Sequence, residues 1–318
     1  MSTDVAAETN LGTALTPRAD HPRNTNTVSS YRAVPSHATT AVNLGPLAEL
    51  PGYWEGTGFS LIARPDFDPD NADGFFLQLN LLRETIEFSS IGSPVPNRGS
   101  QQEDVNLFGV TYLHRVTDAA TGGALHIEPG IWMNIPGTAA DGSDGSVTRL
   151  STVPHGNAVC AVGFAQTADL DGIPDIPSLS TVPYAVGAPP PPPGTPNPYA
   201  AYDLGVDTPY RTNPLPSTIT QALVDDPITM LRDALRGQTM THVTRLILDT
   251  AGGGGVSNIP FITRNADATD LECVFAVERV RLPGGNEVMQ LQYQQVALLS
   301  FRGMVYPHVT VGTLIRAF

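Results

Sequence analysis

The chain has 318 residues, and its 31 acidic and 17 basic side chains give a formal net charge of −14. All 17 basic residues are arginines, which excludes a Schiff-base lysine and a phosphate-loop lysine. The acidic balance, without basic clusters, argues against nucleic acids and anionic membranes as partners. The sequence shows neither the apolar core of a signal peptide nor a bilayer-spanning apolar run, so we expect a cytoplasmic protein.

The N-terminal residues 1–42 are polar, which predicts a disordered or loosely packed arm. Residues 43–318 are expected to form a single domain. Its first element is a short helical turn from Leu47 that stops at Pro51-Gly52, and a strand begins at Tyr53. Gly56 and Gly58 allow this strand to coil strongly, as a strand that closes a barrel does.

Five further stretches read as strands, over residues 75–88, 105–117, 125–135, 147–153 and 158–166. In the first of them the apolar positions move from odd to even numbers at Leu81–Leu82, which predicts a bulge or a turn there. His114 and His242 fall on the apolar faces of predicted strands and are expected to be core residues. Cys160 and Cys273 lie in apolar runs and are expected to be free thiols.

The composition changes between residues 169 and 237. Fourteen of the 29 prolines lie between Asp169 and Pro227, which predicts a long insertion of extended character. The insertion ends in a short helix with Asp226 as its N-cap, Pro227 at the first helical position and Gly237 as its stop. We expect the insertion either to cover a cavity or to form a contact between copies in a homo-oligomer.

The C-terminal part adds predicted strands at 240–250, 258–264, 271–282, 287–301 and 309–315. The turn at 283–286 joins two of them as a hairpin. After Gln295 the apolar phase flips, which predicts a second bulge. About ten strands, mostly antiparallel neighbours with glycine bends, favour a closed all-β barrel over a flat sheet.

Four sequence segments occur in the order seen in one known family. They are Leu50–Phe59 with its Trp and glycines, Glu84–Pro94, Leu125–Trp132 and Tyr306–Val309. In this order they resemble nitrobindin and related haem-binding β-barrels, including bacterial proteins known only as haem-binding. The resemblance covers residues 45–165 and 270–318, and the insertion is foreign to that family. It implies an antiparallel up-and-down calycin-like barrel that binds haem b.

The resemblance places His308 where the family keeps its iron-ligating histidine, so it implies that His308 ligates the metal through Nε2. His155, fixed between Pro154 and Gly156, is the second candidate ligand, or a distal base, or a turn histidine facing solvent. Arginine is the only fixed cation, and Arg64, Arg98 and Arg115 are therefore candidate partners for the haem propionates.

His126 and Glu128 are two residues apart on one predicted strand and therefore project from the same face. They are candidates for positioning water or peroxide, or for binding a propionate. The alternative interpretation is a structural hydrogen bond that closes a hairpin. With His155, they form the set of candidate catalytic residues.

Three functions are compatible with these patterns. The first is a haem-b protein that binds a gas or reacts with peroxide, and as an enzyme it would be peroxidase-like. The second is a metal-free carrier of an apolar small molecule such as a fatty acid or a terpenoid, with inward-facing Gln290, Gln292 and Gln294 orienting a polar head. The third is a cofactor-free cyclase or isomerase that uses His126 or Glu128 as acid or base.

Overall fold

The computed structural model describes residues 37–137 and 145–317. Residues 1–36 of the expected loose arm lie outside the described residues. Residues 37–42 of that arm belong to helix α1 (His37–Leu44), which continues into the 3-10 turn η1 (Gly45–Leu47). Leu44 and Leu47 are buried in the interior core of the barrel, so this lead-in has apolar surface to bury.

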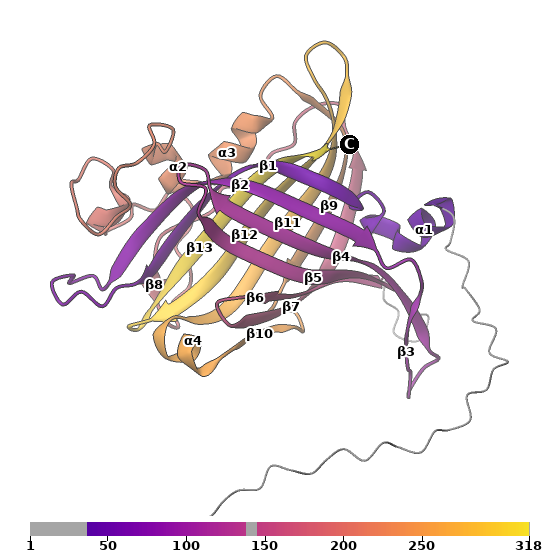
Figure 1. Cartoon of the computed structure of the whole chain (residues 1–318), viewed down its shortest axis with the longest axis horizontal. Coiled ribbons are helices and arrows are strands. Elements are labelled where there is room, and N and C mark those ends of the chain that lie inside the picture. Colours follow the sequence, from indigo (N-terminus) through magenta and orange to yellow (C-terminus); the bar gives the residue numbers. More distant parts are fainter. Residues whose placement is uncertain (1–36, 138–144, 318) are drawn as a thin grey trace, which may run out of the picture. The chain divides into compact units, whose positions relative to one another are not determined.

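Within the described residues, ten long strands form the barrel wall, and each is antiparallel to its neighbours (Figure 1). β1 pairs with β13, which closes the sheet and confirms the predicted all-β up-and-down barrel. In wall order the strands are β1 (Gly52–Pro65), β2 (Phe75–Ser90), β4 (Val105–Asp118), β5 (Ala124–Pro136), β6 (Gly145–Val153), β7 (Asn157–Asp169), β9 (Thr239–Asp249), β11 (Asp267–Arg281), β12 (Glu287–Phe301) and β13 (Met304–Ala317).

Short elements complete the described part of the chain. They are β3 (Val95–Asn97), β8 (Tyr184–Ala185), η2 (Ala200–Tyr202), α2 (Gln221–Asp225), α3 (Ile228–Ala234), β10 (Gly255–Asn258) and α4 (Pro260–Asn265). Helix α4 corrects the strand predicted at 258–264: Pro260 sits in its first turn, where the fixed φ of proline favours a helix. In the described residues, no helix is long and apolar enough to cross a membrane.

The interior of the barrel is apolar at the end where α1 and η1 lie, which we call the helical end. Trp54 is fully buried there, and its indole Nε1 donates a hydrogen bond to the Leu50 carbonyl at 2.8 Å. Trp132 and Phe275 meet edge to face, with ring centroids 5.1 Å apart. This end therefore has a packed floor of large side chains.

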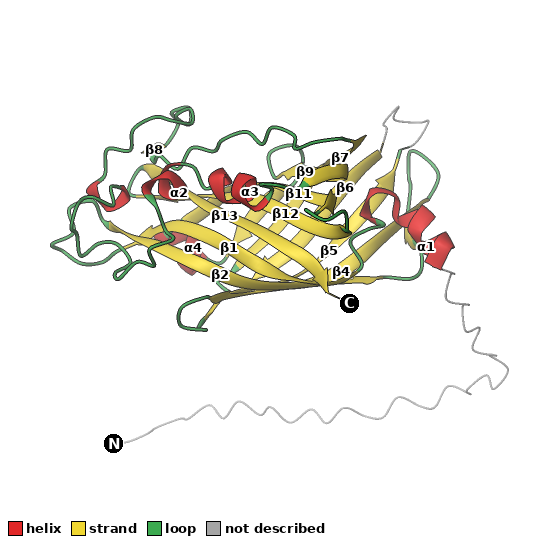
Figure 2. Ribbon diagram, turned by 90° about the horizontal axis from the view of Figure 1, so that it is seen from above, coloured by secondary structure: helices red, strands yellow, loops and turns green. Residues whose placement is uncertain are grey.

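The insertion packs on the outside of the wall, where α2 and α3 lie against β1 and β13 (Figure 2). Leu223, Ile228 and Leu231 of these helices join one buried cluster with outward-facing residues of β1, β2 and β13. The outward-facing members of β1 and β2 are Phe59, Leu61, Leu77 and Leu79. The insertion thus buries an outer face that an ordinary barrel would leave to solvent.

This outer cluster corrects the two predicted bulges. The β1–β2 register is continuous through Leu81–Leu82, and the β12–β13 register is continuous through Gln295. The apolar phase of β2 changes because its first half is buried outward, under the insertion, and its second half inward. Register shifts lie instead at Val116/Thr117, Ala268/Asp270 and Arg279/Val280.

Candidate functional site

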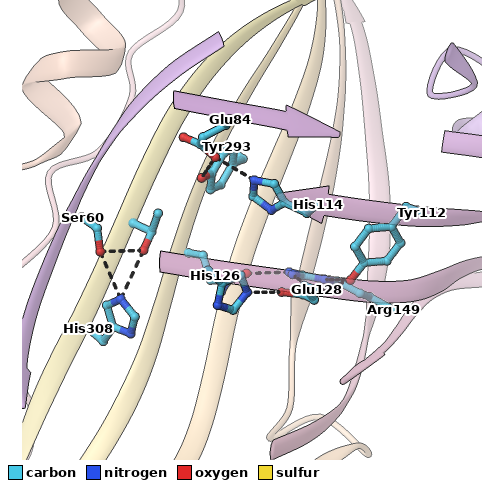
Figure 3. Close-up of polar contacts among 11 residues, drawn as sticks. Ser60, Glu84, Tyr112, His114, His126, Glu128, Arg149, Tyr293 and His308 are labelled. Carbon is cyan, nitrogen blue, oxygen red and sulfur yellow. Dashed lines mark hydrogen bonds and ion pairs between the residues drawn. The ribbon is translucent and has the colours of Figure 1, made fainter. Parts of the chain in front are cut away.

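A belt of polar side chains crosses the middle of the barrel interior, beyond the apolar floor. Its members come from β2, β4, β5, β6 and β12 (Figure 3). They lie on the inward-facing rows of these strands, because the strand registers place them opposite one another or opposite residues of the interior core. The polar belt consists of Glu84, Tyr112, His114, Glu128, Arg149, Tyr293 and Gln295.

Arg149 and Glu128 form the centre of the belt. Arg149 Nη2 donates to Glu128 Oε1 at 2.5 Å, and its Nη1 donates to Gln295 Oε1 at 2.7 Å. Tyr112 Oη also donates to Glu128. Burial alone would raise the pKa of Glu128, but the Arg149 charge and the hydrogen bonds from His126 and Tyr112 hold that pKa well below its usual range. Glu128 is therefore ionised and pairs with a permanent cation.

Aromatic rings enclose the Arg149 guanidinium. Its Cζ atom lies 5.2 Å from the Phe275 ring centroid and 5.7 Å from that of Trp132. Stacking over ring faces stabilises a desolvated cation. The Arg149 side chain is 1% exposed, and its hydrogen bonds hold Glu128 and Gln295 in place.

Glu84, His114 and Tyr293 form a second part of the belt. Glu84 Oε2 accepts from Tyr293 Oη at 2.5 Å and from His114 Nε2 at 2.7 Å. The other carboxylate oxygen, Oε1, is buried without a hydrogen-bond partner among the described residues, and it fills the space that Gly58 and Gly312 leave by lacking a side chain. His114 is thus a buried histidine with a fixed tautomer, as expected of a satisfied core residue.

The end of the barrel opposite the floor carries three histidines, and we call it the histidine end. His126 is partly buried, and its Nε2 donates to Glu128 Oε2 at 3.2 Å. His155 lies exposed in the turn between β6 and β7, with its ring centroid 6.3 Å from that of His126. The structure therefore places His155 beside the pair formed by His126 and Glu128.

His308 faces the interior from β13. Its Nε2 lies 3.2 Å from Ser60 Oγ and 3.4 Å from Thr310 Oγ1. Burial, followed by the charges of His126 and His155, lowers the pKa of His308 to about 3. The imidazole is therefore neutral at pH 7, and Nδ1 is the ring nitrogen without a hydrogen bond among the described residues.

The arginine candidates separate in the structure. Arg64 is exposed at the end of β1, on the inward-facing row that contains Ser60, and its Cζ stacks over the Phe76 ring at 4.7 Å. Arg115 lies on the outer face of β4, one residue from the inward-facing His114, and Arg98 is exposed and paired with Asp104. Of these three candidate arginines, Arg64 alone lies on an inward-facing row of the barrel wall.

The glutamines assigned to the interior lie outside it. Gln292 Nε2 donates to the Leu231 carbonyl of α3, and Gln290 Nε2 donates to Glu278 Oε2 on the outer face of β11. The inward-facing positions of β12 are those of Leu291, Tyr293 and Gln295. Gln290 and Gln292 are buried on the outer face because the end of the insertion packs there, which the sequence pattern does not reveal.

The sequence analysis gave no role at this site to six residues that contribute to it: Ser60, Glu84, Tyr112, Arg149, Tyr293 and Gln295. Arg149 stands two residues from Val147 and two from Ser151, so all three share the inward-facing row of β6. This spacing is the feature of the sequence that could have placed Arg149 in the interior. In the described residues, no three His, Cys, Asp or Glu side chains are grouped to hold a metal ion. Both cysteines are free, as expected.

Comparison with known proteins gives distant structural likenesses alone. No family model matches the chain, and no curated protein matches it. A solved structure described as "Crystal Structure of Rv2717c from M. tuberculosis" aligns over 88% of this chain and 98% of that chain, with 14% identity and a TM-score of 0.43. At these values the likeness carries no argument about family or ligand.

Proposed function

We propose that this protein binds haem b at the histidine end of the barrel, with His308 as the iron ligand. The proposal rests on His308, a neutral, inward-facing imidazole whose Nδ1 makes no hydrogen bond within the described part of the chain. Metal-bound histidines commonly donate their other N–H to an oxygen, and Ser60 Oγ stands in that position. In this arrangement Nδ1, rather than the expected Nε2, is the nitrogen that would bind iron.

The surrounding residues fit a haem in two further respects. Ala297 pairs with His308, and Leu271 pairs with Ala297, so apolar side chains share the inner face beside the imidazole. Arg64, four residues along the same strand row from Ser60, lies roughly 13 Å further out, where a propionate could reach it. Haem, when bound, would supply an iron that binds a diatomic gas or reacts with peroxide.

The chain itself would supply an oriented imidazole near that iron. Glu128 holds His126 through Nε2, and Arg149 holds Glu128, so the His126 ring has little freedom to turn. His126 and Glu128 therefore remain the candidates for moving a proton at the histidine end.

The two alternatives differ in how well the interior suits them. A fatty-acid or terpenoid carrier needs an apolar cavity with a polar group for the head, and the glutamines proposed for that role face outward. A cofactor-free isomerase needs an oriented acid or base, which His126 with Glu128 provides. The isomerase is thus the second candidate.

The decisive measurement is an absorption titration of the apo-protein with hemin. Wild type should develop a shifted Soret band, and His308→Ala should lose it. Added imidazole should restore the band in His308→Ala, because a small ligand can occupy the space of the lost ring. His242→Ala, at the helical end, is the matched control and should behave as wild type.

A wild-type protein that leaves the hemin spectrum unchanged would overturn the proposal. Loss of the band in His155→Ala but not in His308→Ala would move the ligand to the turn and refute the assignment to His308.

A further inference from the structure

An apolar face lies on the outside of the barrel wall, across the neighbouring strands β5, β6 and β7 (Figure 1). The strand registers place Ile131 beside Leu150, and Leu150 beside Cys160. These side chains point outward, because each alternates along its strand with residues that face the interior, as Leu150 does with Arg149. We define the β5–β7 face as the outward-facing residues of segments 127–131, 148–152 and 158–166.

The β5–β7 face carries no charge, although the chain is rich in charged residues. None of its residues is acidic or basic, whereas the whole chain has 31 acidic and 17 basic side chains. The charged residues within the same segments, Glu128 and Arg149, face the interior and bind each other. Two copies of a chain with a net charge of −14 repel each other. This face therefore lets two copies approach without bringing their carboxylates together.

Large apolar side chains on this face are open to solvent. Ile127 and Leu150 are 42% and 41% exposed, and Phe164 is 49% exposed. The insertion covers the outer faces of β1, β2 and β13, but none of these three side chains joins a buried apolar cluster of the described residues (Figure 2). A contiguous exposed patch of this kind marks a surface that contacts another molecule.

The size and shape of the face fit a second copy of the chain. From β4 to β9 it spans four strand spacings, roughly 19 Å, and residues 158–166 extend roughly 26 Å along it. Two copies would thus bury about 1,000 Å² in total, which is the lower limit of a specific interface. Twisted antiparallel sheets pack well face to face, and two copies have the same twist.

We propose that the β5–β7 face is the contact of a reversible two-fold dimer of this chain. In such a contact each copy presents the same surface, so an uncharged face meets an uncharged face. Leu150 stands between Thr148 and Thr152 along the outer row of β6, so the large side chain of one copy can enter the space beside that of the other. The insertion, which packs on its own barrel wall, is not needed for this contact. The inference does not depend on haem binding.

Cys160 provides a chemical probe within the face. It is partly exposed, and it lies beside Leu150 on the neighbouring strand. The other cysteine, Cys273, is buried and 2% exposed. A maleimide should therefore label Cys160 alone in the folded protein, and a dimer that covers the face should protect it.

Sedimentation equilibrium and labelling with N-ethylmaleimide, both from about 1 µM to about 500 µM protein, test the proposal. Wild type should pass from monomer to dimer, and the labelling rate of Cys160 should fall in parallel with the monomer fraction. Raising NaCl from about 50 mM to about 500 mM should strengthen the dimer, because salt screens the repulsion between two acidic copies.

Variants then locate the contact. Leu150→Arg brings like charges together across the two-fold axis, so it should stay monomeric and label at the monomer rate. Phe164→Thr keeps a β-branched residue in the strand and should weaken the dimer about tenfold or more. Ile315→Arg, at an exposed apolar position on β13, is the matched control and should dimerise as wild type does.

A wild-type protein that stays monomeric over the whole range would overturn the proposal. A dimer in which Cys160 labels at the monomer rate would also refute it, because that dimer would use another face. The same holds for a dimer that salt dissociates, since its contact would be ionic. Unchanged association in Phe164→Thr would contradict the assignment even if Leu150→Arg does not fold.

Discussion

Glu278 is a buried carboxyl on the outer face of β11, and it makes the stability of the protein depend on pH. It is 2% exposed, and its Oε2 accepts from Gln290 Nε2 at 2.8 Å. Its neighbours on that face, Val243 and Val280, belong to an apolar cluster that includes Leu235 just after α3. Burial raises the pKa of Glu278 from 4.5 to about 7, although Gln290 and the nearest cation, Arg245, act to lower it.

The shift converts into a free energy with a definite sign. A carboxyl whose pKa is raised on folding binds its proton more tightly in the folded state. The free energy of unfolding therefore falls as the pH rises from about 4.5 to about 7, and this group adds no further change above that range. At 1.36 kcal/mol per pKa unit, the total loss is about 3 kcal/mol. Glu278→Gln keeps the shape and removes the ionisation, so this loss should vanish.

Urea unfolding of wild type and Glu278→Gln at a series of pH values from 4 to 9 measures the effect. The stability of the variant relative to wild type should increase by about 3 kcal/mol between pH 4.5 and pH 8. Glu272→Gln changes an exposed carboxyl on the same strand and should track wild type throughout. Parallel curves for wild type and Glu278→Gln would show that Glu278 is not a buried titrating group.

Three further experiments with substituted proteins test the packing. Glu128→Gln or Arg149→Met alone leaves a buried charged partner uncompensated, so each should lower the free energy of unfolding, measured with urea, by about 3–5 kcal/mol. The double variant Arg149→Met with Glu128→Leu should recover most of that free energy. A double variant as unstable as the single variants would contradict this. Gly58→Ala should cost more than about 1 kcal/mol because its Cβ would overlap a buried carboxylate oxygen. Gly123→Ala should stay within about 0.5 kcal/mol, because its Cβ would meet only the Thr121 hydroxyl, at 3.3 Å, in a surface turn; equal losses would refute the argument. Arg232→Ala removes hydrogen bonds to a carbonyl in the first part of the insertion and should speed proteolysis there; an unchanged cleavage rate would show that this anchor is dispensable.

The strands could be predicted from the sequence wherever one face of the wall is buried and the other is wet, because alternation then records the fold directly. β2 and β12 were predicted as strands, but the bulges predicted within them were wrong, because the insertion changes which face is buried. Apolar residues switch between odd and even positions when the buried face of a strand changes. A bulge causes such a switch, and so does a distant segment that covers the outer face of part of the strand. Pro260 shows the same limit locally: a six-residue helix is too short for a helical period to appear.

The histidines of the site were visible in the sequence, but what fixes them was not. His126 and Glu128 stand two apart on one strand, so their shared face follows from strand geometry. That Arg149 holds Glu128 depends on the pairing of β5 with β6 and on aromatic rings contributed from β4 and β11. A single arginine in a short predicted strand does not indicate which acidic residue of another strand it will bind.

The polar belt separates two ends of the barrel that have different chemistry. A buried ion pair seldom adds stability over apolar side chains of similar size, so a barrel that only needed a core would gain little from Arg149 and Glu128. The pair instead fixes an orientation: Glu128, held by Arg149, accepts a hydrogen bond from His126 and so orients the His126 ring at the histidine end. The neutral His308 faces the same end, and the Arg149 charge is paired with Glu128 rather than with a group at that end. Positioning a histidine, rather than strengthening the fold, is therefore the role of the belt that its geometry supports.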